Sequence, residues 1–138
     1  MKINHTILFL IILFTISCDK PYVDCEYPDY SNCITVEPEN GKLQLKITIN
    51  EENKRVPITL YYGTYENQVI CINDTLEVPK KTYTLPADVY YSVKAQYKSG
   101  NSTINAIDGG FLEKKSYKVC DSICWVVKNI DLNLKLKY

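Results

Sequence analysis

The sequence predicts an all-β domain, an antiparallel immunoglobulin-like β-sandwich of seven or eight strands. Residues 42–50, 89–97 and 130–136 alternate apolar and polar side chains with the period of two that is typical of half-buried strands. Turn-forming clusters recur roughly every 8–12 residues, and no segment shows a sustained helical period. Short strands with regular turns and no intervening helices favour two packed sheets with Greek-key connections.

The strands follow one another in order along the chain. The first is 42–50, in which Leu43, Leu45, Ile47 and Ile49 alternate with polar residues. The remaining predicted strands are 58–62, 69–72, 83–85, 89–97, 103–107, 117–127 with a turn inside it, and 130–136. The turns predicted between them lie at 39–41, 51–53, 79–81, 99–101 and 108–110.

Residues 1–17 have the pattern of a lipoprotein signal peptide. Lys2 precedes roughly ten apolar residues, too few to span a bilayer, which requires about 20. The following residues, Thr15-Ile16-Ser17-Cys18, resemble a bacterial lipobox. This resemblance implies that Cys18 is lipidated on sulfur with palmitate-type chains and anchors the protein in the membrane. The alternative is a plain secreted protein in which Cys18 joins the disulfide set.

Removal of the signal peptide leaves about 120 residues, the size of one domain. We expect a lipidated tether over 18–36 and the β-sandwich over 37–138. The formal net charge is zero, and the charges are interspersed, so nucleic acid is not a favoured partner. The predicted location is the cell envelope, most simply the outer membrane. The leaflet is left open, because Asp19 at the second mature position is an inner-membrane signal only in some bacteria.

Five cysteines remain when Cys18 is set aside, and export places them where thiols tend to pair. The short spacings favour Cys25 with Cys33 and Cys120 with Cys124, although sequence alone does not determine the pairing. Cys71 is left over within an apolar run. Its thiol is either buried and inert or reactive toward another chain.

Tyrosines are abundant and offer a contact surface for a glycan or a protein. Because successive strand residues point to opposite faces, Tyr61 and Tyr90 are predicted to be exposed together, opposite core-facing Tyr62 and Tyr91. Tyr65 and Tyr97 are further aromatic candidates. Packing and cross-strand pairing would explain the same residues without any ligand.

The residues predict no catalytic, cofactor or metal site. The only histidine, His5, falls within the signal peptide, which removes the usual general base and most zinc sites from the mature chain. Glu51, Glu52 and Asp108 are the acidic residues near turns that a carboxylate-based hydrolase would use, but solvated charge explains them better. Residues 108–110, Asp-Gly-Gly, favour a β-turn over a calcium loop.

The segments 56–61, Val-Pro-Ile-Thr-Leu-Tyr, and 83–93, Tyr-Thr-Leu-Pro-Ala-Asp-Val-Tyr-Tyr-Ser-Val, carry a family resemblance. Together with the strands around them, they resemble the small immunoglobulin-like or transthyretin-like modules of Bacteroidota-type lipoproteins, over residues 41–138. The resemblance implies a β-sandwich and supplies no catalytic residues. Asp74-Thr75-Leu76 and Asp121-Ser122-Ile123 are similar to the O-glycosylation sites of such proteins, which makes Thr75 and Ser122 candidate modification sites.

The sequence therefore predicts a lipid-anchored, non-enzymatic module that presents a protein or glycan contact surface. The first alternative is a structural accessory subunit of an outer-membrane or pilus-like complex, in which an edge strand pairs with a partner. A hydrolase or a protease inhibitor is the alternative from another class.

Overall fold

The computed structural model describes residues 25–26 and 29–137. The predicted signal peptide at 1–17 and the predicted lipidation site Cys18 lie outside the described residues. Among the residues described, there is no helix with the length and apolar character needed to cross a membrane.

The described residues form eight strands and one short 3-10 helix. The elements are β1 (Asn40–Lys46), β2 (Val56–Tyr62), η2 (Tyr65–Asn67), β3 (Val69–Leu76), β4 (Lys80–Pro86), β5 (Val89–Ser99), β6 (Ser102–Val119), β7 (Ser122–Lys128) and β8 (Ile130–Asn133). The all-β class predicted from the sequence is thus confirmed.

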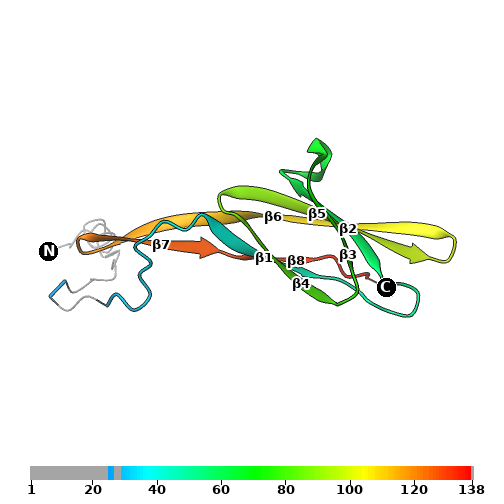
Figure 1. Ribbon diagram of the computed structural model, residues 1–138, viewed down its shortest axis with the longest axis horizontal. Coiled ribbons are helices and arrows are strands. Elements are labelled where there is room, and N and C mark those ends of the chain that lie inside the picture. The colour runs from blue at the N-terminus through cyan, green and yellow to red at the C-terminus, as the bar shows by residue number, and fades with distance from the viewer. Residues whose placement is uncertain (1–24, 27–28, 138) are drawn as a thin grey trace, which may run out of the picture.

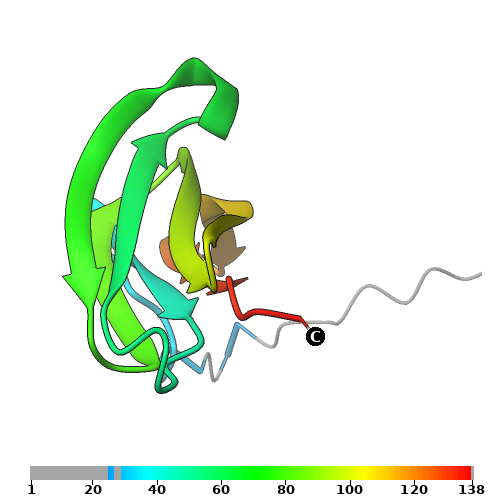
Figure 2. The same cartoon turned by 90° about the vertical axis from the view of Figure 1, so that its right-hand side faces the viewer.

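The strands make two sheets, one with the order β4-β1-β8 and one with the order β3-β2-β5-β6-β7. Their strands curve around a shared interior (Figure 2). All the neighbouring strands in these sheets are antiparallel except β1 and β8, which are parallel. The purely antiparallel prediction is wrong at this pair, because the chain leaves the five-stranded sheet after β7 and enters the other sheet beside β1 in the same direction.

Alternating apolar side chains fill the interior between the sheets. The buried core consists of Leu43, Leu45, Ile47, Val56, Ile58, Leu60, Leu76, Leu85, Tyr91, Val93, Ala95, Tyr97, Leu112, Leu132 and Leu134. Full burial of one aliphatic side chain contributes about 1.5–3 kcal/mol. The Tyr97 hydroxyl donates to the Leu134 carbonyl at 2.7 Å and accepts from the Thr48 amide at 3.2 Å, so this core tyrosine also joins the two sheets.

Strand β6 runs without interruption through residues 108–110, where the sequence predicted a turn. Neither Gly109 nor Gly110 has the positive φ of a tight turn. Both provide space instead: a Cβ on Gly109 would stand 2.8 Å from the Tyr90 hydroxyl oxygen, and one on Gly110 would contact Ile130 at 3.5 Å. The turn prediction is wrong because these glycines accommodate side chains from neighbouring strands.

Residues 113–119 of β6 pair with β7 alone, beyond the part of β6 that pairs with β5. The resulting hairpin projects from the body of the domain, and we call residues 113–128 the arm (Figure 1). Its paired length is about 20 Å at 3.3 Å per residue. A lone two-stranded hairpin is only marginally stable in water, so the arm needs further support.

Two disulfides supply that support by joining the N-terminal segment to the arm. The bonds are Cys25–Cys120 and Cys33–Cys124, with Cα atoms 5.6 and 4.9 Å apart. The predicted local pairs, Cys25 with Cys33 and Cys120 with Cys124, are therefore wrong, although all four cysteines do form disulfides. The pairing differs because a backbone bridge at Ile34 lays the N-terminal segment along the edge of β7.

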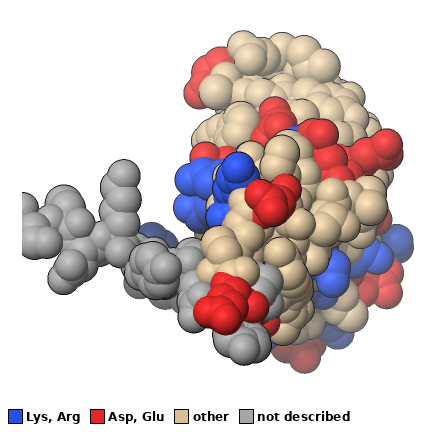
Figure 3. Space-filling model, turned by 90° about the vertical axis from the view of Figure 1, so that its left-hand side faces the viewer, with Lys and Arg blue, Asp and Glu red and all other residues tan. Residues whose placement is uncertain are grey.

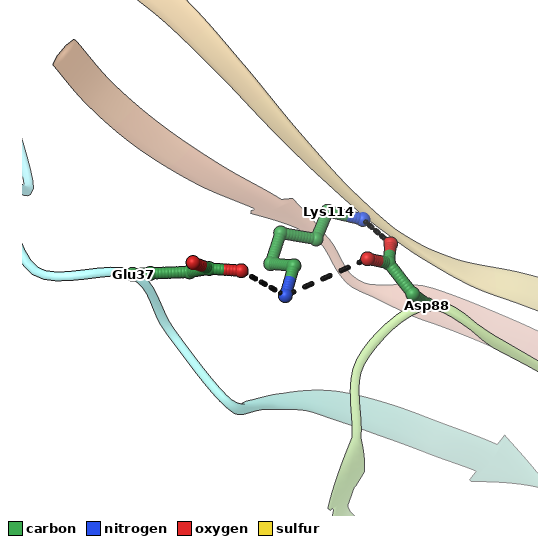
Figure 4. A network of polar contacts seen from close by, with 3 residues as sticks. All are labelled: Glu37, Asp88 and Lys114. Carbon is green, nitrogen blue, oxygen red and sulfur yellow. Dashed lines mark hydrogen bonds and ion pairs between the residues drawn. The ribbon is translucent and has the colours of Figure 1, made fainter.

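Lys114 fastens the base of the arm (Figure 4). Its ammonium group contacts the Glu37 carboxylate and lies 3.5 Å from Oδ2 of Asp88, and its backbone amide donates to Oδ1 of Asp88 at 2.8 Å. The nearby Glu37 carboxylate raises the pKa of Lys114. The same ammonium lies 5.7 Å from the centre of the Trp125 ring. The Lys114 side chain therefore joins four segments: the chain before β1, the turn between β4 and β5, and the strands β6 and β7.

Charges of both signs are interspersed on the face at the arm end of the molecule (Figure 3). Lys115 pairs with Glu113 at 3.0 Å on the arm, and Lys46 pairs with Asp131 at 3.3 Å in the three-stranded sheet. Neither sign forms a continuous patch on the visible surface of this face.

Candidate binding site on the outer face

A hollow of about 410 Å³ opens on the outer face of the five-stranded sheet. It lies between the segment around η2 and the strands β5 and β6, and we call it the outer-face hollow. Tyr65, Tyr90, Ser92, Ile107 and Gly109 are among the residues that line it. It thus brings two of the aromatic candidates, Tyr65 and Tyr90, into one site.

The structure confirms the predicted exposure of Tyr90 and overturns that of Tyr61. Tyr90 is 37% exposed and Tyr91 is buried, as predicted, but Tyr61 is only 2% exposed and Tyr62 is 40% exposed. Tyr62 does pair with Tyr91 on the core side, with ring centres 5.6 Å apart. Tyr61 is covered because the chain folds back after β2 and sets the Tyr65 ring edge-on against it at 5.4 Å.

Tyr90 leans along the sheet instead of standing away from it. Its hydroxyl oxygen and Cε1 lie only 2.8 and 3.0 Å from the position that a Cβ on Gly109 would occupy. The ring therefore crosses from β5 onto the bare backbone of β6, while part of it remains open to solvent. Sequence reasoning found Tyr90 by strand alternation but assigned Gly109 to a turn and missed its role.

The loop before η2 is held to the sheet by two hydrogen bonds of the Gly63 backbone, one to the backbone and one to a side chain of β5. The Gly63 amide donates to the Tyr90 carbonyl at 2.7 Å, and the Gly63 carbonyl accepts from the Ser92 hydroxyl at 2.9 Å. Gly63 has φ +76°, a conformation that favours glycine. Hydrogen bonds from its own amide and from the Thr64 hydroxyl hold the pKa of Glu66 below its ordinary value, so this carboxylate at the hollow is ionised at neutral pH.

The acidic candidates for a hydrolase are not brought together. Glu51 and Glu52 line a hollow beside the β1–β2 loop, where Glu51 pairs with Lys54 at 3.1 Å and Glu52 accepts from the Gly100 amide at 2.6 Å. Asp108 lines the outer-face hollow and also a second hollow, which lies between β6 and residues 128–132.

Both carboxylate oxygens of Asp108 are already engaged by backbone amides. Oδ1 accepts from Gly109 at 2.8 Å, and Oδ2 accepts from Asn133 at 2.7 Å. The residue therefore connects β6 to the end of β8. Within the described ranges, no group of three or more His, Cys, Asp or Glu side chains is arranged to hold a metal ion.

The remaining predicted residues lie apart from the outer-face hollow. Thr75 is exposed near the end of β3, and Ser122 opens β7 beside the turn of the arm. Cys71 has a free thiol and lies half-buried against the core. It is the extra residue at a register shift between β2 and β3, and its hydrogen bond to Tyr62 raises the pKa of that tyrosine.

Comparison with family models, with curated proteins and with solved structures finds no match to this chain. Its class rests on its own geometry: an all-β sandwich with a disulfide-fastened arm.

Proposed function

We propose that this protein is a lipid-anchored, non-enzymatic binding module of the cell envelope, held in the outer membrane through Cys18. Its task is to present the outer face of the five-stranded sheet to a glycan or a protein. The arm holds that face away from the membrane.

The Cys25–Cys120 disulfide carries this proposal. The chain leaves the predicted lipidation site and, seven residues later, is bonded to the turn of the arm. An extended chain of that length reaches at most about 25 Å, so an anchored Cys18 keeps the arm tip near the bilayer. Gly109, at the outer-face hollow, is ten residues from Val119 along β6, which is about 33 Å of strand. The arm therefore suits a spacer between an anchor and a contact surface.

Fractionation of cells that express the full chain tests the anchor. Wild-type protein should sediment with the outer membrane, and Cys18→Ala should move the protein to the soluble fraction. Cys71→Ala is the matched control, because it also removes one cysteine and should leave the protein in the membrane. A wild-type chain that is soluble from the start would refute the proposal.

Protease shaving of intact cells, with mass spectrometry of the released peptides, tests presentation. We expect peptides from the β2–β3 region, next to the outer-face hollow, if that face points outward. Complete protection would place the domain on the periplasmic side and favour the second candidate function.

That second candidate is an accessory subunit that pairs with a partner through β3. This strand is at the edge of its sheet, and Val69 and Ile70 are each 54% exposed. Uncharged apolar residues on an open edge suit pairing with another strand. A partner that co-purifies with the wild type and is lost in Ile70→Lys, but is retained in the control Val78→Lys on the following turn, would support this function.

A further inference from the structure

We propose that the outer-face hollow binds one pyranose ring of a neutral glycan, with Tyr90 as the platform on which the sugar stacks. This inference rests on the proposed function and specifies the ligand of its contact surface. It depends on the geometry of the platform, on a preformed wall that lines the same hollow, and on the charges around both.

The platform is Tyr90. The face of an aromatic ring carries negative charge, which attracts the slightly positive C–H groups on one face of a pyranose. Tyr90 leans over Gly109, where any larger residue would displace it, because a Cβ there would be 2.8 Å from the tyrosine oxygen. The ring is therefore supported by β6 while part of it remains accessible.

The wall is Tyr65, and the fold holds it in place before any ligand arrives. Its ring meets Tyr61 edge-on, and the amide side chain of Gln68 donates to its carbonyl oxygen. Gly63 ties the start of the same loop to β5. A site built in advance loses less conformational entropy when it binds, which favours affinity.

The charges at the hollow select a neutral ligand. Glu66 is ionised and disfavours an anionic sugar, but its carboxylate can accept hydrogen bonds from sugar hydroxyls. Asp108 has both oxygens engaged by backbone amides, and Lys94 lies 5.9 Å from the centre of the Tyr65 ring. Among the described residues that line the hollow, the only charged ones, Glu66 and Asp108, are acidic, and the hydroxyl residues Thr64 and Ser92 lie among its lining. An aromatic platform with such polar groups suits an uncharged ring that carries hydroxyls.

The experiment measures binding of cellohexaose, mannohexaose and N-acetylchitohexaose to the purified full chain by isothermal titration calorimetry, with hexagalacturonate as the acidic probe. At least one neutral probe should bind, more tightly than the acidic one. Tyr90→Ala should weaken that binding about tenfold or more, which is typical of the loss of a stacking partner.

Three variants separate stacking from a folding defect. Tyr90→Phe keeps the ring and should bind within about threefold of wild type, whereas Gly109→Ala displaces the ring and should bind as poorly as Tyr90→Ala. Tyr62→Ala is the matched control. It removes a tyrosine that is also partly exposed but lies on the core side of the five-stranded sheet, away from the outer-face hollow, so affinity should be unchanged.

Absence of binding by every neutral probe would overturn this inference, as would tighter binding of the acidic probe or undiminished binding by Tyr90→Ala. These outcomes are separate from a failure of the proposed function. An anchored, surface-exposed chain that binds no neutral probe would refute the sugar site alone, and a soluble wild-type chain that binds through Tyr90 would refute the anchor alone.

Discussion

The two disulfides should stabilise the protein in a non-additive way, because both join the same two distant parts of the chain and the loops that they close overlap. Their sequence separations are 95 and 91 residues. While one bond is intact, the other closes only a small additional ring, made of the 8 residues from Cys25 to Cys33 and the 4 from Cys120 to Cys124. Loop-closure entropy for about 12 residues corresponds to about 2.8 kcal/mol.

Removal of the second bond then opens the long loop, which corresponds to about 4.6 kcal/mol. Each single-bond variant, Cys25→Ser with Cys120→Ser or Cys33→Ser with Cys124→Ser, should therefore lower the free energy of unfolding by about 2.8 kcal/mol. Loss of both bonds should lower it by about 7.4 kcal/mol, which exceeds the sum of the single losses by about 1.8 kcal/mol. That total is comparable to the whole stability of a typical domain.

Guanidinium unfolding of the four proteins in a Cys18→Ala background measures these differences, and peptide mapping under non-reducing conditions identifies the bonds directly. The local pairing suggested by spacing would close rings of about 8 and 4 residues, and a variant without both bonds would lose only about 4.4 kcal/mol. A total near that value, or a peptide that links Cys25 to Cys33, would refute the reasoning.

Three further predictions concern single sites. Asn53→Ala removes two side-chain hydrogen bonds to the backbone of β5, at 3.1 and 2.7 Å, and should lower the free energy of unfolding in urea by about 2–3 kcal/mol; an unchanged midpoint would contradict this. The Tyr83 hydroxyl donates to Asp74 at 2.6 Å and holds the pKa of Asp74 below its ordinary value of 3.8. This stabilisation is present above the unfolded-state pKa and is lost as pH falls through the folded-state pKa, so Tyr83→Phe should flatten the acid limb of the stability profile; an identical limb would rule it out. Intact-mass measurement of native protein should show added hexose-scale mass that disappears with Thr75→Ala or Ser122→Ala, and an unmodified mass would remove the glycosylation hypothesis.

The strand pattern could be predicted because it is local. Alternation in 89–97 places Tyr91, Val93 and Ala95 on one face, and the structure buries all three. The same rule identified Tyr90 on the opposite face. Alternation did not predict the exposure of Tyr61 and Tyr62. Tyr61 lies on the expected outer face, but a loop that folds back covers it, and Tyr62 lies on the core side yet remains 40% exposed.

The role of Gly109 could not be predicted in the same way. An Asp-Gly-Gly sequence is typical of a turn, and only the tertiary structure shows Tyr90 crossing from the neighbouring strand onto the glycine backbone. The outer-face hollow was missed for the same reason, because three segments distant in sequence meet there.

The sequence by itself determined the all-β class and the faces of the regular strands, because strand period and turn chemistry are local properties. It also indicated the four cysteines that become bonded, because the number and spacing of the cysteines can be read directly from the chain. Only the tertiary structure decided which cysteines pair, how β8 joins the second sheet, and that β6 continues into an arm. These features depend on contacts between residues far apart in the chain, and strand periodicity carries no information about which distant partner a strand will meet.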